Sequence, residues 1–216
     1  MPRVLILSGG GDLTDPWHPF GTTSQLVLEA VASPGRDVRI STNVLDGLAQ
    51  LSADVDLVVV NAANAERPAR GDAEAIAGLG AYLRGGGALL ALHVSATAFP
   101  EIAEWESIIG ARWVRGTTMH PDQDLAAIRV DTDAHPIVSG VHDFEVWDER
   151  YTHLRVATDV RALAWHELDG VAHPLLWARD YAGGRVVYDA LGHDAASFES
   201  REHRAILARS AEWLLG

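Results

Sequence analysis

The chain contains no cysteine, and this single absence excludes disulfide bonds, thiolate metal ligands and a cysteine nucleophile. Basic residues are in short supply, since 17 lysines and arginines stand against 30 aspartates and glutamates and leave a formal net charge of −13 at pH 7. Because this acidic surplus is spread along the chain, we expect its surface to repel phosphate backbones and anionic lipids. We therefore expect neither a nucleic-acid partner nor a membrane partner.

Long apolar runs are missing as well. No stretch approaches the roughly 18 uncharged apolar residues of a transmembrane helix, and residues 1–8 enter a strand-like run without an apolar signal region or a cleavage site. The sequence therefore predicts a cytoplasmic protein. Its 216 residues, 48% hydrophobic and 22% charged, are ordinary for a globular chain and, at about 150 residues per domain, favour one domain over residues 1–216.

The first half alternates short apolar runs with segments of helical spacing. Strands are predicted over residues 4–7, 38–42, 55–60 and 88–92, and helices over residues 22–32, 44–51 and 72–84. The strands are nearly continuous in valine, leucine and isoleucine, as is typical of strands buried on both faces. This alternation predicts right-handed crossovers and a parallel, doubly wound sheet.

The second half has a different rhythm, with many short strand-like segments between turn residues. After a helix predicted over residues 100–109, strands are predicted over residues 112–115, 125–130, 144–147, 162–166, 174–178 and 185–189, and an amphipathic helix over residues 200–215 closes the chain. No linker rich in proline, serine and glycine separates the two halves. The pattern therefore predicts one domain with a β-rich decoration in its C-terminal half.

Two histidines come soon after predicted strands. His93 lies at the centre of residues 91–95 (Ala-Leu-His-Val-Ser), where small residues flank it as in the tight strand-to-helix turns that expose a catalytic side chain. His193 follows the strand over residues 185–189, and Gly192 allows the backbone to turn there. Because ligands of open α/β sheets bind beyond the carboxyl ends of the strands, both histidines are candidate site residues. The alternative is that His93 only satisfies neighbouring backbone groups.

Polar and aromatic side chains near other turns complete the set of candidates. Asp148, Glu149 and Tyr151 follow a predicted strand, and carboxylates beside a tyrosine can orient sugar hydroxyls or transfer protons. An exposed acidic turn is the alternative for these residues. Trp17 and His18 lie in a long loop, where an aromatic ring can stack on the apolar face of a sugar. The alternative there is a lid residue that tucks onto the body of the protein.

Ten histidines are many for a chain of this length. Neutral imidazole is the commonest metal ligand in proteins and also a general acid or base near neutral pH. No His-x-x-x-His or Glu-x-x-His pair occurs, so a local metal motif is absent. The sequence makes no cofactor certain, and it leaves open a divalent ion, zinc or manganese, held by residues that are distant in the sequence.

Several blocks taken together resemble the ThuA-like family, which is named for trehalose utilisation and whose fold is similar to that of class I glutamine amidotransferases. The blocks are residues 85–93 (Gly-Gly-Gly-Ala-Leu-Leu-Ala-Leu-His), residues 105–110 (Trp-Glu-Ser-Ile-Ile-Gly) leading to His120, His135 and Pro136 leading to residues 148–151 (Asp-Glu-Arg-Tyr), and residues 174–193. The resemblance covers most of the chain and implies a flavodoxin-like, three-layer α/β/α sandwich with a mainly parallel sheet. The amidotransferase relatives carry a cysteine where this sequence has His93, so glutamine hydrolysis through a thioester is excluded.

The activity that the resemblance implies is carbohydrate chemistry on trehalose or a related disaccharide or keto-sugar, and the expected partner is a small-molecule sugar. We expect an acid–base enzyme, a sugar isomerase, lyase or hydrolase, in which His93 and His193 act as base and acid and Glu149 orients or shares a proton. The residues expected to contact the sugar are Trp17, His18, Ser95, His120, Asp148 and Tyr151. Two alternatives are a non-catalytic sugar-binding or regulatory protein and a metal-dependent hydrolase whose histidines and Glu149 hold the ion. Whether the chain forms a homo-oligomer stays open.

Overall fold

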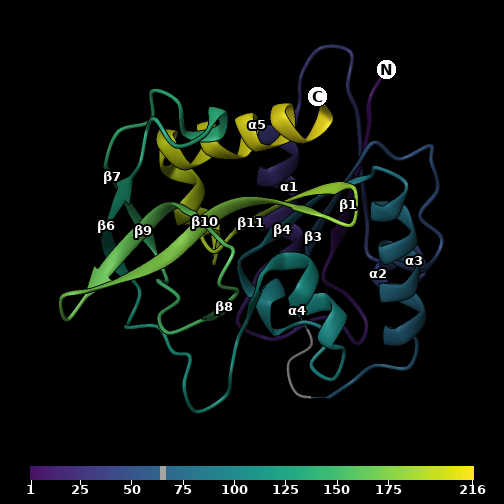
Figure 1. Cartoon of the computed structure of the whole chain (residues 1–216), viewed down its shortest axis with the longest axis horizontal. Coiled ribbons are helices and arrows are strands. Elements are labelled where there is room, and N and C mark those ends of the chain that lie inside the picture. The colour runs from purple at the N-terminus through teal and green to yellow at the C-terminus, as the bar shows by residue number, and fades with distance from the viewer. Residues whose placement is uncertain (64–66) are drawn as a thin grey trace.

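A nine-stranded sheet runs through the molecule and organises the rest of the chain (Figure 1). The structure, a computed structural model, describes residues 1–63 and 67–216. In their order across the sheet the strands are β2 (Asp37–Ser41), β1 (Arg3–Ser8), β3 (Leu57–Asn61), β4 (Ala88–Leu92), β11 (Gly184–Asp189), β10 (Val171–Tyr181), β9 (Ala162–Leu168), β6 (Asp124–Val130) and β7 (Phe144–Asp148). The first five strands are parallel to one another, and the remaining pairings are antiparallel.

Helices cover both faces of the parallel part and make a three-layer arrangement. They are α1 (Phe20–Val31), α2 (Val44–Ala49), α3 (Asp72–Arg84), α4 (Ala103–Ile109) and α5 (Arg201–Leu215), with 3₁₀ turns at His93–Thr97, Pro136–Val138 and Ala195–Glu199. Helices α1 and α5 contact each other on one face, whereas α2 and α4 both contact α3 on the other (Figure 1). Among the described residues, no helix has both the length and the apolar composition needed to cross a membrane. The predicted α/β fold with a mainly parallel central sheet is confirmed.

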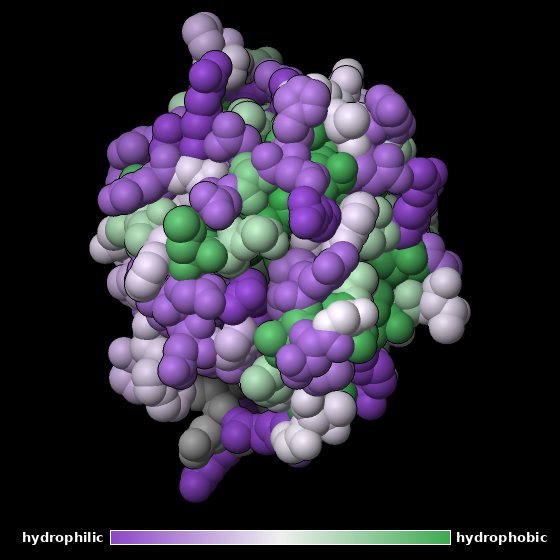
Figure 2. All heavy atoms as spheres, turned by 90° about the vertical axis from the view of Figure 1, so that its left-hand side faces the viewer, coloured by the Kyte–Doolittle hydropathy of each residue, from purple (hydrophilic) through white to green (hydrophobic). Residues whose placement is uncertain are grey.

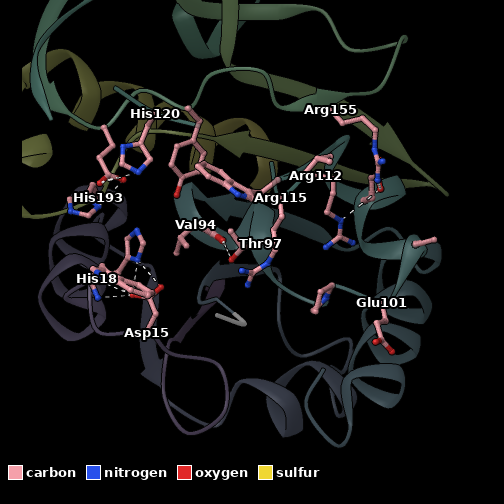
Figure 3. A pocket seen from close by; sticks show the side chains of 18 residues that line it. Asp15, His18, Val94, Thr97, Glu101, Arg112, Arg115, His120, Arg155 and His193 are labelled. Atoms are coloured by element: carbon pink, nitrogen blue, oxygen red, sulfur yellow. Dashed lines mark hydrogen bonds and ion pairs between the residues drawn. The ribbon is translucent and has the colours of Figure 1, made fainter. Parts of the chain in front are cut away.

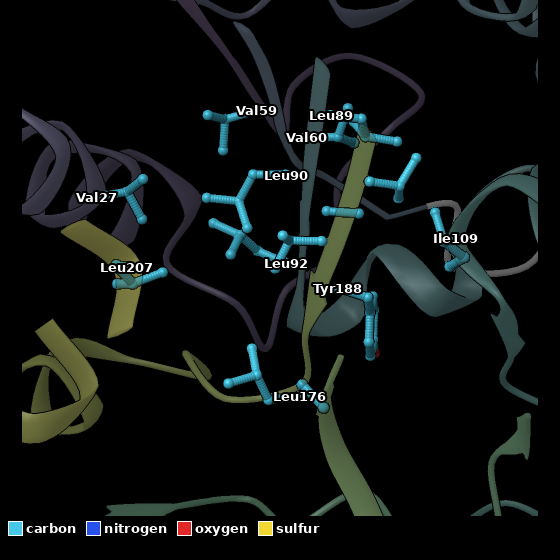
Figure 4. Close-up of a cluster of buried hydrophobic side chains, with 14 of the residues drawn as sticks. Val27, Val59, Val60, Leu89, Leu90, Leu92, Ile109, Leu176, Tyr188 and Leu207 are labelled. Atoms are coloured by element: carbon cyan, nitrogen blue, oxygen red, sulfur yellow. The ribbon is translucent and has the colours of Figure 1, made fainter. Parts of the chain in front are cut away.

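Strands β3 and β4 are buried along their whole length because helices cover them on both sides. Figure 4 shows Val27 of α1 and Leu207 of α5 on one side of these strands and Ile109 of α4 on the other. Leu90 of β4 lies among them and is fully buried. This burial explains why the strands are read in the sequence as uninterrupted apolar runs instead of alternating ones.

The C-terminal strands continue the main sheet, so the predicted β-rich decoration is an extension of it. Strand β10 pairs with β11 on one side and with β9 on the other, and thereby joins the parallel and antiparallel parts. Its pairing with β9 shifts between Pro174 and Leu176, where proline offers no N–H to the ladder. Strands β6 and β7 form the far end of the sheet, on the side of the molecule that faces the viewer in Figure 2. The exposed side chains of Leu125 and Trp147 pair across these two strands.

Two helices begin two or more residues away from the predicted start. Helix α1 begins at Phe20 instead of Thr22, because Pro19, with φ fixed near −79°, starts the helix without a side-chain cap. Helix α4 begins at Ala103 instead of Pro100, which lies in a turn before the helix. Pro19 directly precedes α1, whereas Glu101 and Ile102 separate Pro100 from the first residue of α4.

The strand predicted over residues 112–115 is shorter than expected. It ends at Arg112 as β5 (Ala111–Arg112), and its partner β8 (Arg155–Val156) also has only two residues. The N–H of Trp113 donates to the carbonyl of Ala96 instead of continuing the ladder. The two strands form a small sheet apart from the main one.

Three histidines form a cluster between β9, β10 and the loop after β7. His166 is fully buried and pairs with His173 across the strands, with ring centroids 5.2 Å apart, and the ring of His153 lies 4.6 Å from that of His173. Nε2 of His166 donates to the carbonyl oxygen of Tyr151 at 3.2 Å. Burial lowers the pKa of His166 to about 4, with the neighbouring His173 acting in the same direction. A neutral imidazole therefore fixes the backbone at Tyr151.

Acid is expected to destabilise the fold through His166. Its pKa is about 4 in the folded chain and 6.5 when unperturbed, so below pH 6.5 the unfolded state binds a proton that the folded state does not. The free energy of unfolding therefore falls as the pH falls through this range. For His166→Gln, which keeps an N–H donor, we expect the loss between pH 7 and pH 4.5 to shrink by about 2–3 kcal/mol, measured by urea unfolding at both pH values. The exposed His142→Gln is the matched control, and an unchanged loss in His166→Gln would contradict the assignment.

Candidate functional site

Three strands that run in the same direction end at one edge of the sheet, and a candidate site forms there. Strand β11 is parallel to β4, and four antiparallel steps through β10, β9 and β6 make β7 run the same way. The segments after these strands carry His93, Glu149 and His193. The topology therefore brings together residues that are far apart in the sequence, as expected for the carboxyl edge of an open α/β sheet.

His93 is fixed by three contacts with residues in and after strands β11 and β7. Its Nδ1 atom lies 2.7 Å from the carbonyl oxygen of Ala190, and its own carbonyl accepts a hydrogen bond from the hydroxyl of Tyr188 at 2.8 Å. The imidazole stacks on the ring of Tyr151 with centroids 4.3 Å apart. The backbone of His93 has φ +38°, a conformation that costs on the order of 1–3 kcal/mol in a residue with a side chain. These contacts hold the strained turn and its ring in one orientation.

The turn that carries His193 is held by the buried carboxylate of Asp148. This carboxylate accepts hydrogen bonds from the N–H of Gly192 at 2.7 Å, the N–H of His193 at 3.1 Å and the hydroxyl of Ser197. Gly192 has φ +114°, which favours glycine at the turn. The expectation that Asp148 contacts the sugar is therefore wrong, because its side chain has no exposed surface. Its role is to position His193.

A buried Asp-His-Ser array lies behind Asp148. Nδ1 of His203 lies 3.0 Å from the hydroxyl oxygen of Ser197, and Nε2 lies 3.3 Å from a carboxylate oxygen of Asp189. These are the residue types of a hydrolytic triad. However, all three side chains are buried, and the hydroxyl of Ser197 donates to Asp148. The array therefore supports the site and offers no nucleophile to a ligand.

Glu149 lies at the centre of the site. Its Oε2 atom is 3.2 Å from Nδ1 of His193 and 3.6 Å from Nε2 of His93, and its Oε1 atom is 3.7 Å from Nε2 of His120. Burial alone would raise the pKa of Glu149, but the imidazoles of His193 and His93 outweigh it and hold that pKa well below its usual range. Glu149 is therefore an ionised carboxylate among three imidazoles.

The loop before α1 adds His18 and Asp15 to the cluster around Glu149. Nδ1 of His18 lies 2.7 and 2.8 Å from the two carboxylate oxygens of Asp15. This carboxylate also accepts hydrogen bonds from the backbone N–H groups of Trp17 and His18. The ring of His18 meets those of His193 and His93 edge-on, at 4.8 and 5.2 Å. Ligand atoms of His18, His93, His193 and Glu149 thus all lie within 4.8 Å of one another.

The surroundings shift the pKa values of His18 and His193 in opposite directions. Burial lowers the pKa of His18, and the neighbouring His93 and His193 add to this effect against the raising influence of Asp15. For His193, burial also disfavours the charged form, but the carboxylate of Glu149, with Asp148 and Asp194 behind it, raises the pKa overall. Burial would raise the pKa of Asp15, yet the contact with His18 lowers it. The site therefore contains two ionised carboxylates.

An open cavity of about 870 Å³ lies against this cluster. Figure 3 shows His18, His120 and His193 at one end of the cavity and Arg112 and Arg155 at the other. Both arginines are paired with the carboxylate of Glu106. Aromatic side chains that line the cavity are Trp17, Trp113 and Tyr151. The cavity therefore combines a titratable end, a basic end and aromatic walls.

The structure brings most of the expected site residues together. Glu149, His193, His120, His18, Tyr151 and Trp17 line the cavity, and Trp17 is 66% exposed. His93 belongs to the cluster but is only 1% exposed and lies behind Glu149. Ser95 is fully buried, and its carbonyl accepts from the indole of Trp105. The expectation that Ser95 contacts a ligand is therefore wrong.

Sequence reasoning missed Asp15, Trp113 and the arginines of the cavity. Asp15 carried a local signal, because an aspartate three residues before His18 can accept the backbone N–H groups of a turn as well as the imidazole N–H. Arg112 and Arg155 carried no such signal, since they meet only through the pairing of β5 with β8.

Comparison with known proteins shows the family to which the chain belongs. The family model for ThuA, described as trehalose utilisation, matches residues 3–214. The chain belongs to the ThuA family. A comparison with curated proteins finds no match.

Solved structures include two ThuA-like proteins that are similar over nearly the whole chain. One from Parabacteroides merdae is 20% identical, with a TM-score of 0.81 over 100% of this chain and 90% of that chain. One from Bacteroides uniformis is 14% identical, with a TM-score of 0.77 over 99% of this chain and 91% of that chain. A β-galactosidase from Bacillus circulans sp. alkalophilus is 13% identical, with a TM-score of 0.63 over 98% of this chain and 31% of that chain. At these identities the likeness shows the fold that ThuA proteins share.

Removing the negative charge of Asp148 should loosen the turn that carries His193. In Asp148→Asn, an amide N–H₂ replaces an acceptor that faces N–H donors, so we expect a loss of about 2–4 kcal/mol in the free energy of unfolding. Urea unfolding measures this loss. The exposed Asp133→Asn is the matched control and should change stability by less than about 0.5 kcal/mol. Equal stability of the two variants would show that Asp148 does not hold the turn.

Proposed function

We propose that this protein is an enzyme of carbohydrate utilisation that moves protons on a sugar bearing a carbonyl group. The observation that carries the proposal is the meeting of Glu149, His193 and His120 at one end of an open cavity of about 870 Å³. This size lies within the roughly 300–1,000 Å³ of small-molecule sites. Protons next to a carbonyl are acidic enough for a positioned imidazole or carboxylate to remove them, so isomerisation or elimination needs no covalent nucleophile.

The groups that reach the cavity are the ones assigned to proton exchange with the sugar. His193, His120 and Glu149 line the cavity, whereas His93 lies behind Glu149. We therefore assign proton transfer to the first three residues and the positioning of Glu149 to His93. This revises the expectation from the sequence that His93 is the base. Because Glu149 lies between two cavity-facing imidazoles, a proton taken from one carbon has a path to a second group.

Covalent routes to a sugar carbonyl are closed to the side chains of this protein. All 17 basic residues are arginines, so no lysine can form a Schiff base, and no cysteine can form a thiohemiacetal. The carbonyl must then be polarised by hydrogen-bond donors or by a positive charge. This chemistry favours acid–base catalysis over covalent catalysis at the site.

The walls of the cavity suit a carbohydrate. Trp17 and Trp113 present aromatic surface, and the polar ends of the cavity offer donors and acceptors for hydroxyl groups. The ThuA family is associated with trehalose utilisation, which supplies the substrate class of the proposal. An oxidised disaccharide, with its carbonyl at the histidine end and its second ring toward Arg112, fits both observations.

Exchange of hydrogen for deuterium tests the proposal directly. Trehalose and a keto derivative of trehalose are incubated with the protein in D₂O, and the signals of hydrogens next to the carbonyl are followed by NMR. We expect wild-type protein to speed their loss and Glu149→Gln to lower that rate about 10²–10⁴-fold. Glu145→Gln, an exposed residue of β7, is the control. Changes in NMR chemical shift that report sugar binding, without deuterium exchange or turnover by the wild type, would overturn the proposal and favour a sugar-binding protein.

Trp17 is expected to bind the sugar without taking part in proton transfer. It lines the cavity beside His18 and is largely exposed. For Trp17→Ala we expect KM to rise about tenfold, equivalent to about 1.4 kcal/mol, with kcat changed less than about threefold. Trp17→Phe should keep most of the affinity. Trp147→Ala, at the far end of the sheet, is the matched control, and a fall in kcat at constant KM in Trp17→Ala would contradict this role.

A further inference from the structure

Three buried imidazole nitrogens face one small space without a hydrogen bond. They are Nε2 of His18, Nε2 of His93 and Nδ1 of His193, and none makes a hydrogen bond of good geometry among residues 1–63 and 67–216. The nitrogens of His93 and His193 lie 3.6 and 3.2 Å from Oε2 of Glu149. With an oxygen of Glu149 they form the set of atoms that lie within 4.8 Å of one another. A buried polar atom that loses water without gaining a partner is costly. Three such atoms at one point indicate a missing ligand.

Outer hydrogen bonds determine where two of the lone pairs point. Nδ1 of His93 faces the carbonyl oxygen of Ala190, which can only accept, and Nδ1 of His18 faces the carboxylate of Asp15. Each Nδ1 atom therefore carries the hydrogen, and each Nε2 atom presents a lone pair to the cluster. Histidines that bind metals are held in this way, with the second ring nitrogen donating to a backbone carbonyl or a carboxylate.

The charges of the cluster also suit a cation. Glu149 and Asp15 bring two carboxylates to the site, while the rings of His18, His93 and His193 lie 4.8–5.6 Å apart. Three imidazolium ions at this spacing would repel one another, so protonation cannot satisfy all three nitrogens. One divalent cation satisfies the three nitrogens and an oxygen of Glu149 together, and it balances the two negative charges.

We infer that His18, His93, His193 and Glu149 hold one divalent first-row transition ion. Three nitrogen ligands favour an ion such as Zn²⁺, which accepts imidazole, over Mg²⁺, Ca²⁺ and Mn²⁺, which prefer oxygen ligands. Ion–ligand bonds of about 2.0–2.2 Å require the four side chains to draw slightly closer than they are here. His93 closes the floor of the site, and the side toward the cavity is left for a substrate.

This inference deepens the proposed function and rests on it only for the identity of the substrate. A bound cation supplies the positive charge that polarises a sugar carbonyl. The chain has no lysine that could activate the carbonyl as a Schiff base instead. With the ion bound, His193 and Glu149 serve as ligands, and the proton transfer assigned to them above passes to His120. His120, with Nε2 3.7 Å from Oε1 of Glu149, lies outside the ligand set and is the imidazole left for proton transfer.

Metal binding is tested without any sugar. Tag-free protein, stripped with a chelator and dialysed, is titrated with Zn²⁺ alone by calorimetry, and Co²⁺ is added to a second sample to record the visible absorption of its ligand field. We expect one ion per chain and a rise in Tm with Zn²⁺, because the ion binds the folded state. His18→Gln and His93→Gln should weaken binding at least about 100-fold, and Asp15→Asn about 10–100-fold. His142→Gln, an exposed histidine, should bind as the wild type does.

Two results would overturn the ion site. One is the absence of stoichiometric Zn²⁺ binding to the wild type. The other is binding to His18→Gln as tight as to the wild type, which would assign the ion to surface histidines. Circular dichroism shows whether each variant is folded, and if the buried substitution at His93 prevents folding, His18→Gln decides the question.

His120→Gln separates the ion site from the proposed function. It should bind Zn²⁺ as the wild type does and lose the deuterium exchange at the sugar. Tight Zn²⁺ binding with no exchange by the wild type supports the ion site and overturns the proposed function. Full deuterium exchange by the stripped protein in the presence of chelator supports the proposed function and shows that the ion takes no part in the reaction.

Discussion

The site depends on one buried carboxylate, that of Asp148. It lies at the end of β7, in the antiparallel extension, and holds the two amides of the turn after β11, in the parallel part. Because Glu149 is the next residue in the chain, the same contact sets the distance between Glu149 and His193. A carboxylate bound to N–H groups is a strong acceptor, and its burial makes the contact expensive to break. The two parts of the sheet are thereby locked together at the point where the cluster forms.

Several features around the cluster lower the stability of the fold and at the same time fix the geometry of the site. His93 has a left-handed backbone, three imidazoles crowd around Glu149, and the Asp-His-Ser array behind Asp148 is polar and buried. None of these features is needed to build a three-layer sandwich, whose core is the apolar layers on β3 and β4. Strained and desolvated groups of this kind collect at functional sites because the rest of the fold holds them in place.

Much of this arrangement could be predicted from the sequence, and the reasons are specific. The apolar runs at β3 and β4 predicted buried parallel strands, and the position of His93 and His193 after strands predicted a shared edge. Glu149 followed from the same rule. The burial of Asp148 and Ser95 could not be predicted, because whether a polar residue after a strand faces a cavity or the interior depends on neighbours that are remote in the chain.

Other parts of the site depend wholly or partly on tertiary structure. The lone pairs of His18 and His93 point into the cluster because Asp15 and Ala190 occupy the opposite ring nitrogens, and only the second of these contacts links distant segments. The arginine end of the cavity needs the two-residue pairing of β5 with β8, which is too short to leave a pattern. The continuity of the sheet through β10 was hidden by Pro174, which is typical of a strand edge or an irregularity.

The order in which the chain supplies these groups has a consequence for its synthesis. His18 comes from the first loop, His93 and His120 from the middle, Glu149 later, and His193 follows the last strand of the sheet. Contacts that span so much of the sequence form slowly, because long loops must close before they are stabilised. A nascent chain that has not yet released β11 from the ribosome can hold apolar layers but has no complete cluster. Assembly of the five side chains therefore marks the completion of folding, and the protein gains its chemistry only in that last step.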